Sequence, residues 1–375
     1  MTSQYRMQGY IQAGPTCLDL TLKSVEEPAE TIAESVKQGQ FERIILTGIG
    51  SSYTASLISA PLFAWYSPVP VQVVDSWEFT NLPRRIVNEK TLVVAISRSG
   101  ERGLVIDSLK RAEQDGAYVV AVTGMPGSLI TEYARLTIVT QEGPEITYPK
   151  TKSVICCAGA LMRLALALAD RSDAEATKRL IELRAMPEVL ERTFRHTERA
   201  VAGLIPAIEK HELIGLMGTG SNYGVALEGA LKLQETSGLP TFGASTCDFH
   251  GGLVGGVTSK WLVFALVTRQ DKDLNLGVLH IARELGAGIA CVTEPNLNAA
   301  EQCAHCVTLP TSVDSLLSGL VYLVPMQLLT YLLTVAKGKN PDSPASMDIM
   351  LKALLPPGRE EPELRAKSLL QQSPY

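Results

Sequence analysis

One stretch of the sequence places three charged side chains on what would be a single helix face. In YGVALEGALKLQETS, residues 223–237, Glu228, Lys232 and Glu235 occupy positions i, i+4 and i+7 among small and apolar residues. At about 100° per residue, these positions share one side of a helix. A carboxylate beside an amine can move protons to and from a substrate. The stretch is therefore either a solvated row of ion pairs or part of an active site.

Two further motifs carry groups that could bind an anion. GIGSSYTAS, residues 48–56, and AISRSGERG, residues 95–103, each follow an apolar, β-branched run. Glycine allows close backbone approach, and a helix start, a hydroxyl and a guanidinium all donate hydrogen bonds to phosphate. Neither motif is a Walker loop or a dinucleotide fingerprint. The alternative for the first motif is an ordinary strand–helix turn in which glycine serves packing.

These motifs need strands and helices to position them, and the sequence indicates both. Short β-branched runs alternate with helical patterns, which predicts a parallel α/β fold. We expect strands at residues 43–48, 70–74, 91–97, 118–124, 135–140, 213–218, 261–268, 287–293 and 305–310. Both anion-binding motifs would then leave the carboxyl edge of one sheet, where open α/β sheets bind their ligands.

The chain also repeats itself. TGIGSSYTAS and MGTGSNYGVA both end an expected strand and open a helix, and Gly50 precedes Gly220 by 170 residues. Two copies of one fold explain this spacing. We therefore predict two tandem, doubly wound parallel-sheet lobes of the α/β class. The expected segments are an N-terminal helical segment (1–40), lobe 1 (41–172), a helical connector (173–209), lobe 2 (210–350) and a C-terminal tail (351–375).

Bulk properties exclude several classes of function. The chain has 375 residues, a net charge of −5 and no dense Lys/Arg run, so we expect no nucleic-acid partner. Seven cysteines, an odd number, argue against a disulfide framework, and CAHC at 303–306 lacks a second ligand pair, so we expect no metal. Residues 315–336 carry no charge, yet Pro325 and Gln327 favour a buried core helix over a membrane span. We expect a cytoplasmic protein without a signal peptide or membrane partner.

Taken together, the motifs resemble the sugar isomerase (SIS) family. The likeness rests on SRSGE, on GPEITYPKTKSV and on GTGSNYGVALEGALKLQETS, and it covers residues from about Arg43 to Pro344. Within the family, the chain is similar to the isomerase domain of glutamine–fructose-6-phosphate aminotransferase, to amino-sugar-phosphate deaminases and to fructosamine-6-phosphate deglycases. The resemblance implies a sugar-phosphate ligand, no cofactor, and a homodimer or higher homo-oligomer with its active site near the interface.

The resemblance also implies roles for individual residues. The phosphate would be bound by Gly50, Ser51, Ser52, Ser97, Arg98, Ser99 and Arg102. Glu235 falls on the family's catalytic glutamate, which moves a proton between C1 and C2, and Lys232 falls on an assisting lysine. His250 falls on a histidine associated with ring opening. Thr151 would line the pocket, and Glu78 would lie near the substrate or a subunit interface.

Two departures from the family pattern leave an alternative open. The family usually reads His-Gly-Pro where this chain has His250-Gly-Gly, and Ile349 stands where aminotransferases carry a lysine. We expect an aldose–ketose isomerase, deaminase or deglycase acting on an amino-sugar or fructosamine 6-phosphate. The alternative is a sugar-phosphate sensor without activity. We assign Glu228 a structural role.

Overall fold

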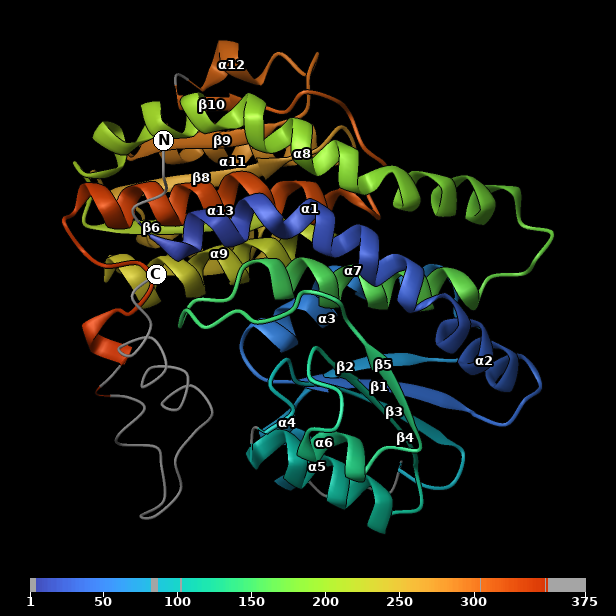
Figure 1. Ribbon diagram of the computed structural model, residues 1–375. Coiled ribbons are helices and arrows are strands. Elements are labelled where there is room, and N and C mark those ends of the chain that lie inside the picture. The colour runs from blue at the N-terminus through green and yellow to red at the C-terminus, as the bar shows by residue number, and fades with distance from the viewer. Residues whose placement is uncertain (1–4, 82–86, 102, 304, 348, 350–375) are drawn as a thin grey trace.

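The computed structural model describes residues 5–81, 87–101, 103–303, 305–347 and 349. The described residues form two parallel sheets, one in each half of the chain, with helices packed against them (Figure 1). The predicted α/β class and the two tandem lobes are thereby confirmed. The expected tail at 351–375 lies outside the described residues.

The first sheet contains five parallel strands in the order β2-β1-β3-β4-β5. Their bounds are β1 (Arg43–Gly48), β2 (Val71–Asp75), β3 (Thr91–Ile96), β4 (Tyr118–Thr123) and β5 (Leu136–Val139). In the register, Thr47 of β1 pairs with Ala95 of β3. The turns that follow β1 and β3 therefore leave the sheet side by side at its carboxyl edge.

The second sheet repeats this order as β10-β9-β8-β6-β7. Its strands are β6 (Leu213–Gly218), β7 (Thr241–Ser245), β8 (Trp261–Val267), β9 (Gly288–Thr293) and β10 (His305–Thr308). Strand β7 is absent from the sequence-based prediction because TFGAS is short and rich in small residues. Gly243 lets β7 approach helix α9, since a Cβ there would lie 2.6 Å from the carbonyl oxygen of Ala226.

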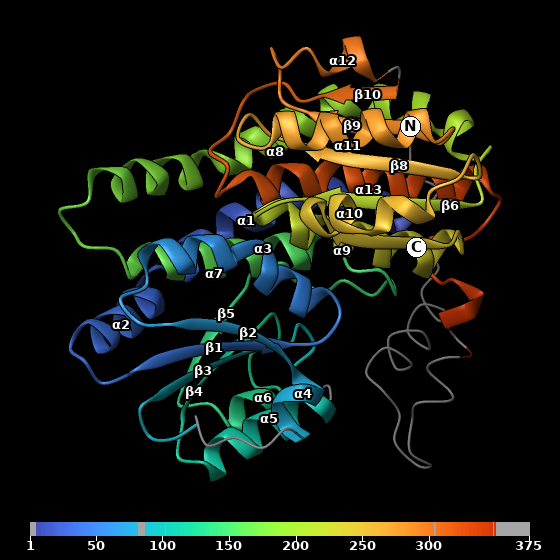
Figure 2. The ribbon, with the colours of Figure 1, turned by 180° about the vertical axis from the view of Figure 1, so that it is seen from behind.

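Helices cover both sheets and fill the space between them (Figures 1 and 2). The first half contributes α1 (Arg6–Ser24), α2 (Glu26–Lys37), α3 (Ser51–Tyr66), α4 (Ser76–Asn81), α5 (Gly103–Gln114), α6 (Leu129–Glu132) and α7 (Lys152–Ala167). The second half contributes α8 (Ala174–Ile208), α9 (Ser221–Ser237), α10 (Thr246–Gly251), α11 (Lys272–Glu284), α12 (Ala299–Gln302), α13 (Ser318–Ala336) and a 3-10 turn (Leu253–Gly256).

The two lobes meet through α3 and α9. A Cβ on Gly224 of α9 would lie 2.7 Å from the backbone nitrogen of Ile58 and 3.0 Å from the carbonyl oxygen of Thr54, so only glycine permits this approach. The hydroxyl of Ser221 donates to the Ile58 carbonyl oxygen at 2.6 Å. One continuous apolar core runs through both lobes as a result, and it fixes α9 against the start of α3.

Helix α13 contains most of the uncharged segment at residues 315–336. Among the described helices, it is the one long and apolar enough to cross a membrane, but 83% of its 18-residue apolar window is buried inside the structure. It packs against α8 and α9. The prediction of a buried core helix is confirmed.

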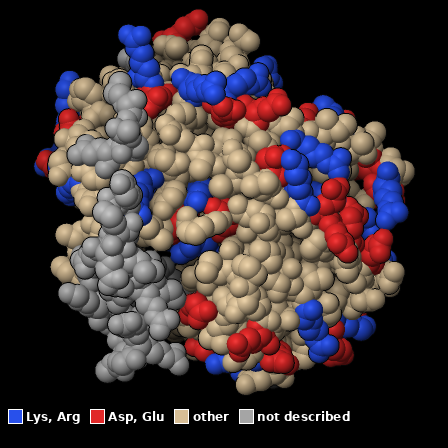
Figure 3. All heavy atoms as spheres, in the orientation of Figure 1, with Lys and Arg blue, Asp and Glu red and all other residues tan. Residues whose placement is uncertain are grey.

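The charged side chains on the face shown in Figure 3 do not separate by sign. Lys and Arg lie in small groups next to Asp and Glu over the described part of this face. A nucleic-acid backbone needs a broad region of positive charge, and this face of the described residues does not offer one.

Candidate active site

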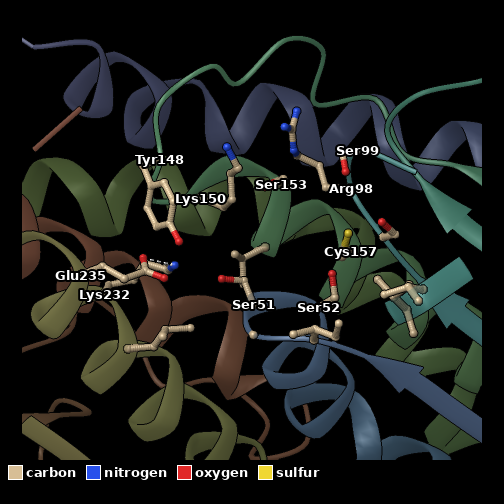
Figure 4. A pocket seen from close by; sticks show the side chains of 17 residues that line it. Ser51, Ser52, Arg98, Ser99, Tyr148, Lys150, Ser153, Cys157, Lys232 and Glu235 are labelled. Carbon is tan, nitrogen blue, oxygen red and sulfur yellow. Dashed lines mark hydrogen bonds and ion pairs between the residues drawn. The ribbon is translucent and has the colours of Figure 1, made fainter. Parts of the chain in front are cut away.

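A cavity of about 310 Å³ lies where the turns of the first sheet face helix α9 (Figure 4). Three parts of the chain form its walls: the turns after β1 and β3, the segment leading into α7, and the second half of α9. The predicted site residues that line it are Gly50, Ser51, Ser52, Ser97, Arg98, Ser99, Lys232 and Glu235. The structure thus brings together groups that lie more than 180 residues apart in the sequence.

The turn after β1 depends on the backbone conformation of Gly50. Its φ of +55° and ψ of −124° suit glycine, while a Cβ there would meet nothing closer than Leu231 Cδ2 at 3.8 Å. Conformation, and not lack of space, therefore requires glycine. The turn directs the start of α3, with Ser51 and Ser52, toward the cavity. A 16-residue helix carries partial positive charge at this end, where the Ser52 N–H is bonded to the Ile49 carbonyl oxygen at 3.1 Å.

The turn after β3 is held against the end of β4. The Arg98 carbonyl oxygen accepts hydrogen bonds from Thr123 Oγ1 at 3.2 Å and from the Gly124 N–H at 3.3 Å. The hydroxyl oxygen of buried Ser97 accepts from the Gly100 N–H at 3.2 Å. Arg98 Nε is buried and has no hydrogen-bond partner among the described residues. A fixed backbone thus carries the Arg98 guanidinium at the cavity wall, where its charge also acts on the buried Glu142 carboxylate and opposes the rise of its pKa on burial.

Helix α9 supplies a buried ion pair. Lys232 Nζ lies 2.5 Å from Glu235 Oε2 and 3.7 Å from Glu228 Oε1. The Lys232 side chain is 3% exposed and that of Glu235 is 13% exposed. Burial by itself would lower the pKa of Lys232, but the two neighbouring carboxylates outweigh it and raise the pKa above its usual value. The amine therefore stays charged next to Glu235, and Figure 4 shows the pair facing the cavity.

Glu228 links the two lobes beside the cavity. Its carboxylate accepts from Ser51 Oγ at 3.0 Å and from Thr54 Oγ1 at 2.6 Å, both on α3. Complete burial raises the pKa of Glu228, although Lys232 and these hydroxyl donors oppose the shift. These contacts agree with the structural role assigned to Glu228. They also direct the Ser51 hydroxyl toward Glu228.

Thr151 does not line the cavity. Its backbone N–H and its hydroxyl both donate to Oε1 of buried Glu145, at 2.7 and 2.8 Å. Oε2 of the same carboxylate accepts from Ser153 Oγ at 2.6 Å. Burial would raise the pKa of Glu145, but the Lys150 ammonium and these hydrogen bonds outweigh it and hold the pKa below its usual value. Glu145 thus caps the start of α7, and Ser153 takes the cavity-lining position that we expected for Thr151.

Tyr148, Lys150 and Ser153 line the cavity although the sequence analysis did not select them. All three belong to GPEITYPKTKSV, a motif of the family likeness from which only Thr151 was selected as a site residue. Lys150 Nζ donates to the carbonyl oxygens of Thr147 at 2.5 Å and Glu145 at 3.2 Å. An amine in a Pro- and Tyr-containing loop between a strand end and a helix start is the signal that could have identified Lys150.

The remaining predicted residues lie elsewhere. Glu78 on α4 and His250 on α10 are exposed, and neither lines the cavity. Figure 2 shows α4 on the first lobe and α10 on the second. Arg102 lies outside the described residues. Among the described residues, no cluster of three or more His, Cys, Asp or Glu side chains is placed to hold a metal ion.

Comparison with known proteins agrees with this arrangement. The model of the SIS domain matches residues 40–167 and 207–337. Glutamine–fructose-6-phosphate aminotransferase of Thermococcus kodakarensis is 30% identical over 338 residues, covering 89% of this chain and 55% of that protein. The enzyme of the same name from Pyrococcus horikoshii is 28% identical and covers 82% and 51%. The chain spans about half the length of the curated relatives it matches.

Solved structures share the fold at lower identity. The C-terminal domain of glucosamine-fructose-6-phosphate aminotransferase from Francisella tularensis superposes with a TM-score of 0.84 at 21% identity, covering 92% of this chain and 99% of that one. Tagatose-6-phosphate ketose/aldose isomerase from Escherichia coli gives 0.79 at 18% identity, with coverage of 90% and 95%. The two matched segments and the two sheets coincide, and we conclude that this chain belongs to the SIS domain family and carries two SIS domains in tandem.

Proposed function

We propose that this protein acts on an amino-sugar or fructosamine 6-phosphate by moving a proton between C1 and C2, followed by hydrolysis of a C–N bond. The observation that carries the proposal is the Glu235–Lys232 pair, which faces the same cavity as the serine-rich turns. The matched relatives are named as isomerizing aminotransferases, and a solved structure that shares the fold is named glucosamine-6-phosphate deaminase.

The phosphate would bind at the first-lobe turns. The N–H groups at the start of α3, the hydroxyls of Ser52 and Ser99, and the Arg98 guanidinium all border the cavity. Charge-assisted hydrogen bonds of this kind are roughly twice as strong as neutral ones. Binding energy gained at the phosphate, remote from the reacting carbons, can be used to orient C1 and C2 against α9. This chemistry calls for no nucleotide.

Glu235 would serve as the base. In the open-chain sugar, its carboxylate removes the proton from one carbon and returns it to the neighbouring carbon, which passes the substrate through an enediol or enolamine. The Lys232 ammonium, held 2.5 Å from the carboxylate, can stabilise negative charge that develops on the substrate oxygen. A positioned base of this type contributes about 10²–10⁴-fold to a rate.

Hydrolysis would complete the reaction. One 2-amino-sugar phosphate and one water molecule give one ketose phosphate and one ammonia. One fructosamine phosphate, whose nitrogen is on C1, and one water molecule give one aldose phosphate and one free amine. If hydrolysis does not follow, the protein is a plain isomerase. Supplying glucosamine 6-phosphate and a panel of fructosamine 6-phosphates, and measuring released amine together with ketose and aldose phosphates, distinguishes these cases.

The Glu235→Gln variant tests the assignment of the base. The amide keeps the shape of the side chain but cannot accept the proton, so we expect kcat to fall by about 10²–10⁴-fold with little change in KM. Arg195→Gln, which removes an exposed charge on α8, is the control and should leave kcat and KM unchanged. An unchanged kcat in Glu235→Gln would rule out this carboxylate as the base.

A second candidate, a sugar-phosphate sensor, is favoured by the position of His250. This exposed side chain does not line the cavity of its own chain, so ring opening would need a second copy to supply it. Mixing inactive His250→Ala and Glu235→Gln proteins tests the homodimer that we propose, because mixed dimers would regain one intact site. If the wild-type protein binds sugar phosphate but turns over no substrate of the panel, the result would support the sensor.

A further inference from the structure

Glu142 is a buried glutamate behind the turn that carries Arg98, and the chemistry above does not use it. It is 2% exposed and lies between β5 and α7. Its carboxyl group packs against the turn after β4, because a Cβ on Gly124 would lie 2.6 Å from the Glu142 carboxyl carbon. The Gly124 N–H donates to the Arg98 carbonyl oxygen at 3.3 Å. Glu142 therefore contacts the residue that holds the Arg98 turn in place.

The surroundings of Glu142 supply no hydrogen bond to its carboxyl group. Both of its oxygens are buried without a hydrogen-bond partner among the described residues, and the same holds for Thr140 Oγ1 and Arg98 Nε. Glu145 is buried too, but it accepts from the backbone at the start of α7 at 2.7 Å and from the Ser153 hydroxyl at 2.6 Å. A buried carboxylate without such donors is unfavourable, which favours the neutral acid. Of the two glutamates, Glu142 is thus the one that retains its proton to higher pH.

The charges around Glu142 do not cancel this difference. Burial has the largest influence and raises the pKa of Glu142; the Thr140 hydroxyl and the Arg98 guanidinium oppose the rise, and the Glu145 carboxylate adds to it. The thiols that face Glu142 from α1 and α7 are those of Cys17, Cys156 and Cys157. Burial raises the pKa of each thiol, so all three stay neutral. The cation that acts on Glu142 is thus Arg98.

A phosphate at the first-lobe turns would interact with the same guanidinium. A neutral Glu142 leaves the positive charge of Arg98 to the phosphate, whereas an ionised Glu142 would compete for it. A bound phosphate would likewise make the ionisation of Glu142 less favourable, because like charges repel. Coupling between two binding equilibria is reciprocal, so proton binding at Glu142 and phosphate binding should strengthen each other by the same factor.

We propose that Glu142 is a positioning residue that acts on the phosphate site through Arg98: its neutral acid supports tight binding of the sugar phosphate, and its ionisation weakens that binding. The inference rests on the proposed function, because it requires phosphate to bind at these turns. The step moves one proton between water and the Glu142 carboxylate, and it changes no covalent bond of the ligand. Glu142 itself would not touch the substrate.

The pH dependence of ligand affinity tests this proposal. Glucitol 6-phosphate lacks a carbonyl group and cannot undergo proton transfer between C1 and C2, so it binds without turnover. It is titrated calorimetrically into full-length wild-type and Glu142→Gln proteins between about pH 5.5 and pH 9. Ionisation of the phosphate itself is common to both titrations. We expect equal Kd values at the acidic end and about tenfold weaker binding by the wild type at the alkaline end, because Gln cannot ionise.

Proton uptake gives a second readout, which a purely structural role of Glu142 would not change. Repeating the titrations in buffers of different ionisation enthalpy counts the protons that are taken up on binding. Where its Kd rises with pH, the wild type should take up more protons than Glu142→Gln. Glu142→Ala should behave like Glu142→Gln, whereas Glu132→Gln, which changes an exposed carboxylate on α6, should behave like wild type. Circular dichroism and melting temperature report whether each variant is folded.

Variants of Arg98 test the route of the effect. In an Arg98→Gln background, Glu142→Gln should no longer improve binding at the alkaline end, because the guanidinium that transmits the effect is absent. Equal Kd values for wild type and Glu142→Gln at every pH, or an improvement that survives in the Arg98→Gln background, would overturn the inference. Wild-type turnover of glucosamine 6-phosphate is measured alongside, because its absence would instead count against the proposed function.

Discussion

The turn after β1 and the turn after β6 have almost the same backbone but different surroundings. Gly50 has φ +55° and ψ −124°, and Gly220 has φ +52° and ψ −128°. The first turn opens onto the cavity. Beside the second turn, the carboxylate of Asp271 accepts hydrogen bonds from Thr219 Oγ1 at 2.5 Å and from Thr268 Oγ1 at 2.9 Å.

The difference shows how a repeated fold can divide its tasks. Lobe 2 supplies its own carboxylate beside the turn, so its hydroxyl donors are satisfied from within. In lobe 1, Ser51 at the corresponding turn donates to Glu228, a carboxylate of lobe 2, while Ser52, Ser99 and Arg98 line the cavity. Lobe 2 contributes instead the ion pair of α9, which reaches the lobe-1 cavity because α9 packs closely against α3. In the proposed mechanism, anion binding and proton transfer therefore come from different copies of one fold.

Removing the amine of α9 should have the largest effect on stability. Lys232→Met removes the ammonium from the buried Glu228 carboxylate and the partly buried Glu235 carboxylate, which should cost about 3–5 kcal/mol of unfolding free energy. Lys260→Met breaks an exposed pair with Glu212, whose side chain is 68% exposed, and should cost less than about 1 kcal/mol. Urea denaturation measures both. Equal losses would show that the α9 pair is not effectively buried.

Removing one hydroxyl from a turn of each lobe compares how the two lobes contribute to substrate binding. Ser99→Ala should raise KM for a sugar phosphate about tenfold or more, because a donor to charged phosphate is lost. Thr219→Val removes the corresponding kind of hydroxyl from lobe 2 and should leave KM unchanged. Initial-rate kinetics on both variants checks this. A raised KM in Thr219→Val alone would reverse the assignment of lobes.

Removing the internal carboxylate of lobe 2 should affect folding and not binding. Asp271→Ala removes the acceptor of three hydrogen bonds. In the wild type, the Thr268 backbone N–H donates to it at 2.7 Å, and the hydroxyls of Thr268 and Thr219 donate to it as well. We expect a loss of about 1–3 kcal/mol in unfolding free energy, with KM within twofold of wild type. If KM rises as much as in Ser99→Ala, the two turns do not differ in function as we infer.

The smallest effect concerns pH and Glu145. Because its pKa is lowered in the folded protein, this carboxylate stabilises the fold above the ordinary glutamate pKa, and the contribution disappears as pH falls through the lower, folded-state value. Glu145→Gln should therefore be less stable than wild type at pH 7, and the gap should shrink as the pH falls below 4.5, the ordinary pKa of a glutamate side chain. Thermal melts across this range measure the gap. A gap that is constant with pH would exclude this mechanism.

The sequence predicts most strands because each is a short apolar run, and central strands such as β3 are buried along their whole length. The exception, β7, is built from small residues, and its place depends on contact with α9, which no local pattern reveals. The site residues also fall into those that a local motif predicts and those that it does not. The serine turns and the α9 pair are local motifs and meet as expected, whereas Thr151 binds Glu145, six residues earlier, through a helix-cap contact that has no periodic signal.

Deuterium exchange at the reacting carbon tests the central claim most directly. Glucosamine 6-phosphate deuterated at C2 is incubated in ordinary water with wild-type or Glu235→Gln protein, and NMR follows the loss of deuterium, while titration confirms that both proteins bind the ligand. We predict loss of deuterium from C2 with wild type, by transfer to C1 or washout into water, and none above background with the variant. Washout at the wild-type rate in Glu235→Gln would contradict proton transfer by this helix, and with it the division of roles between the lobes.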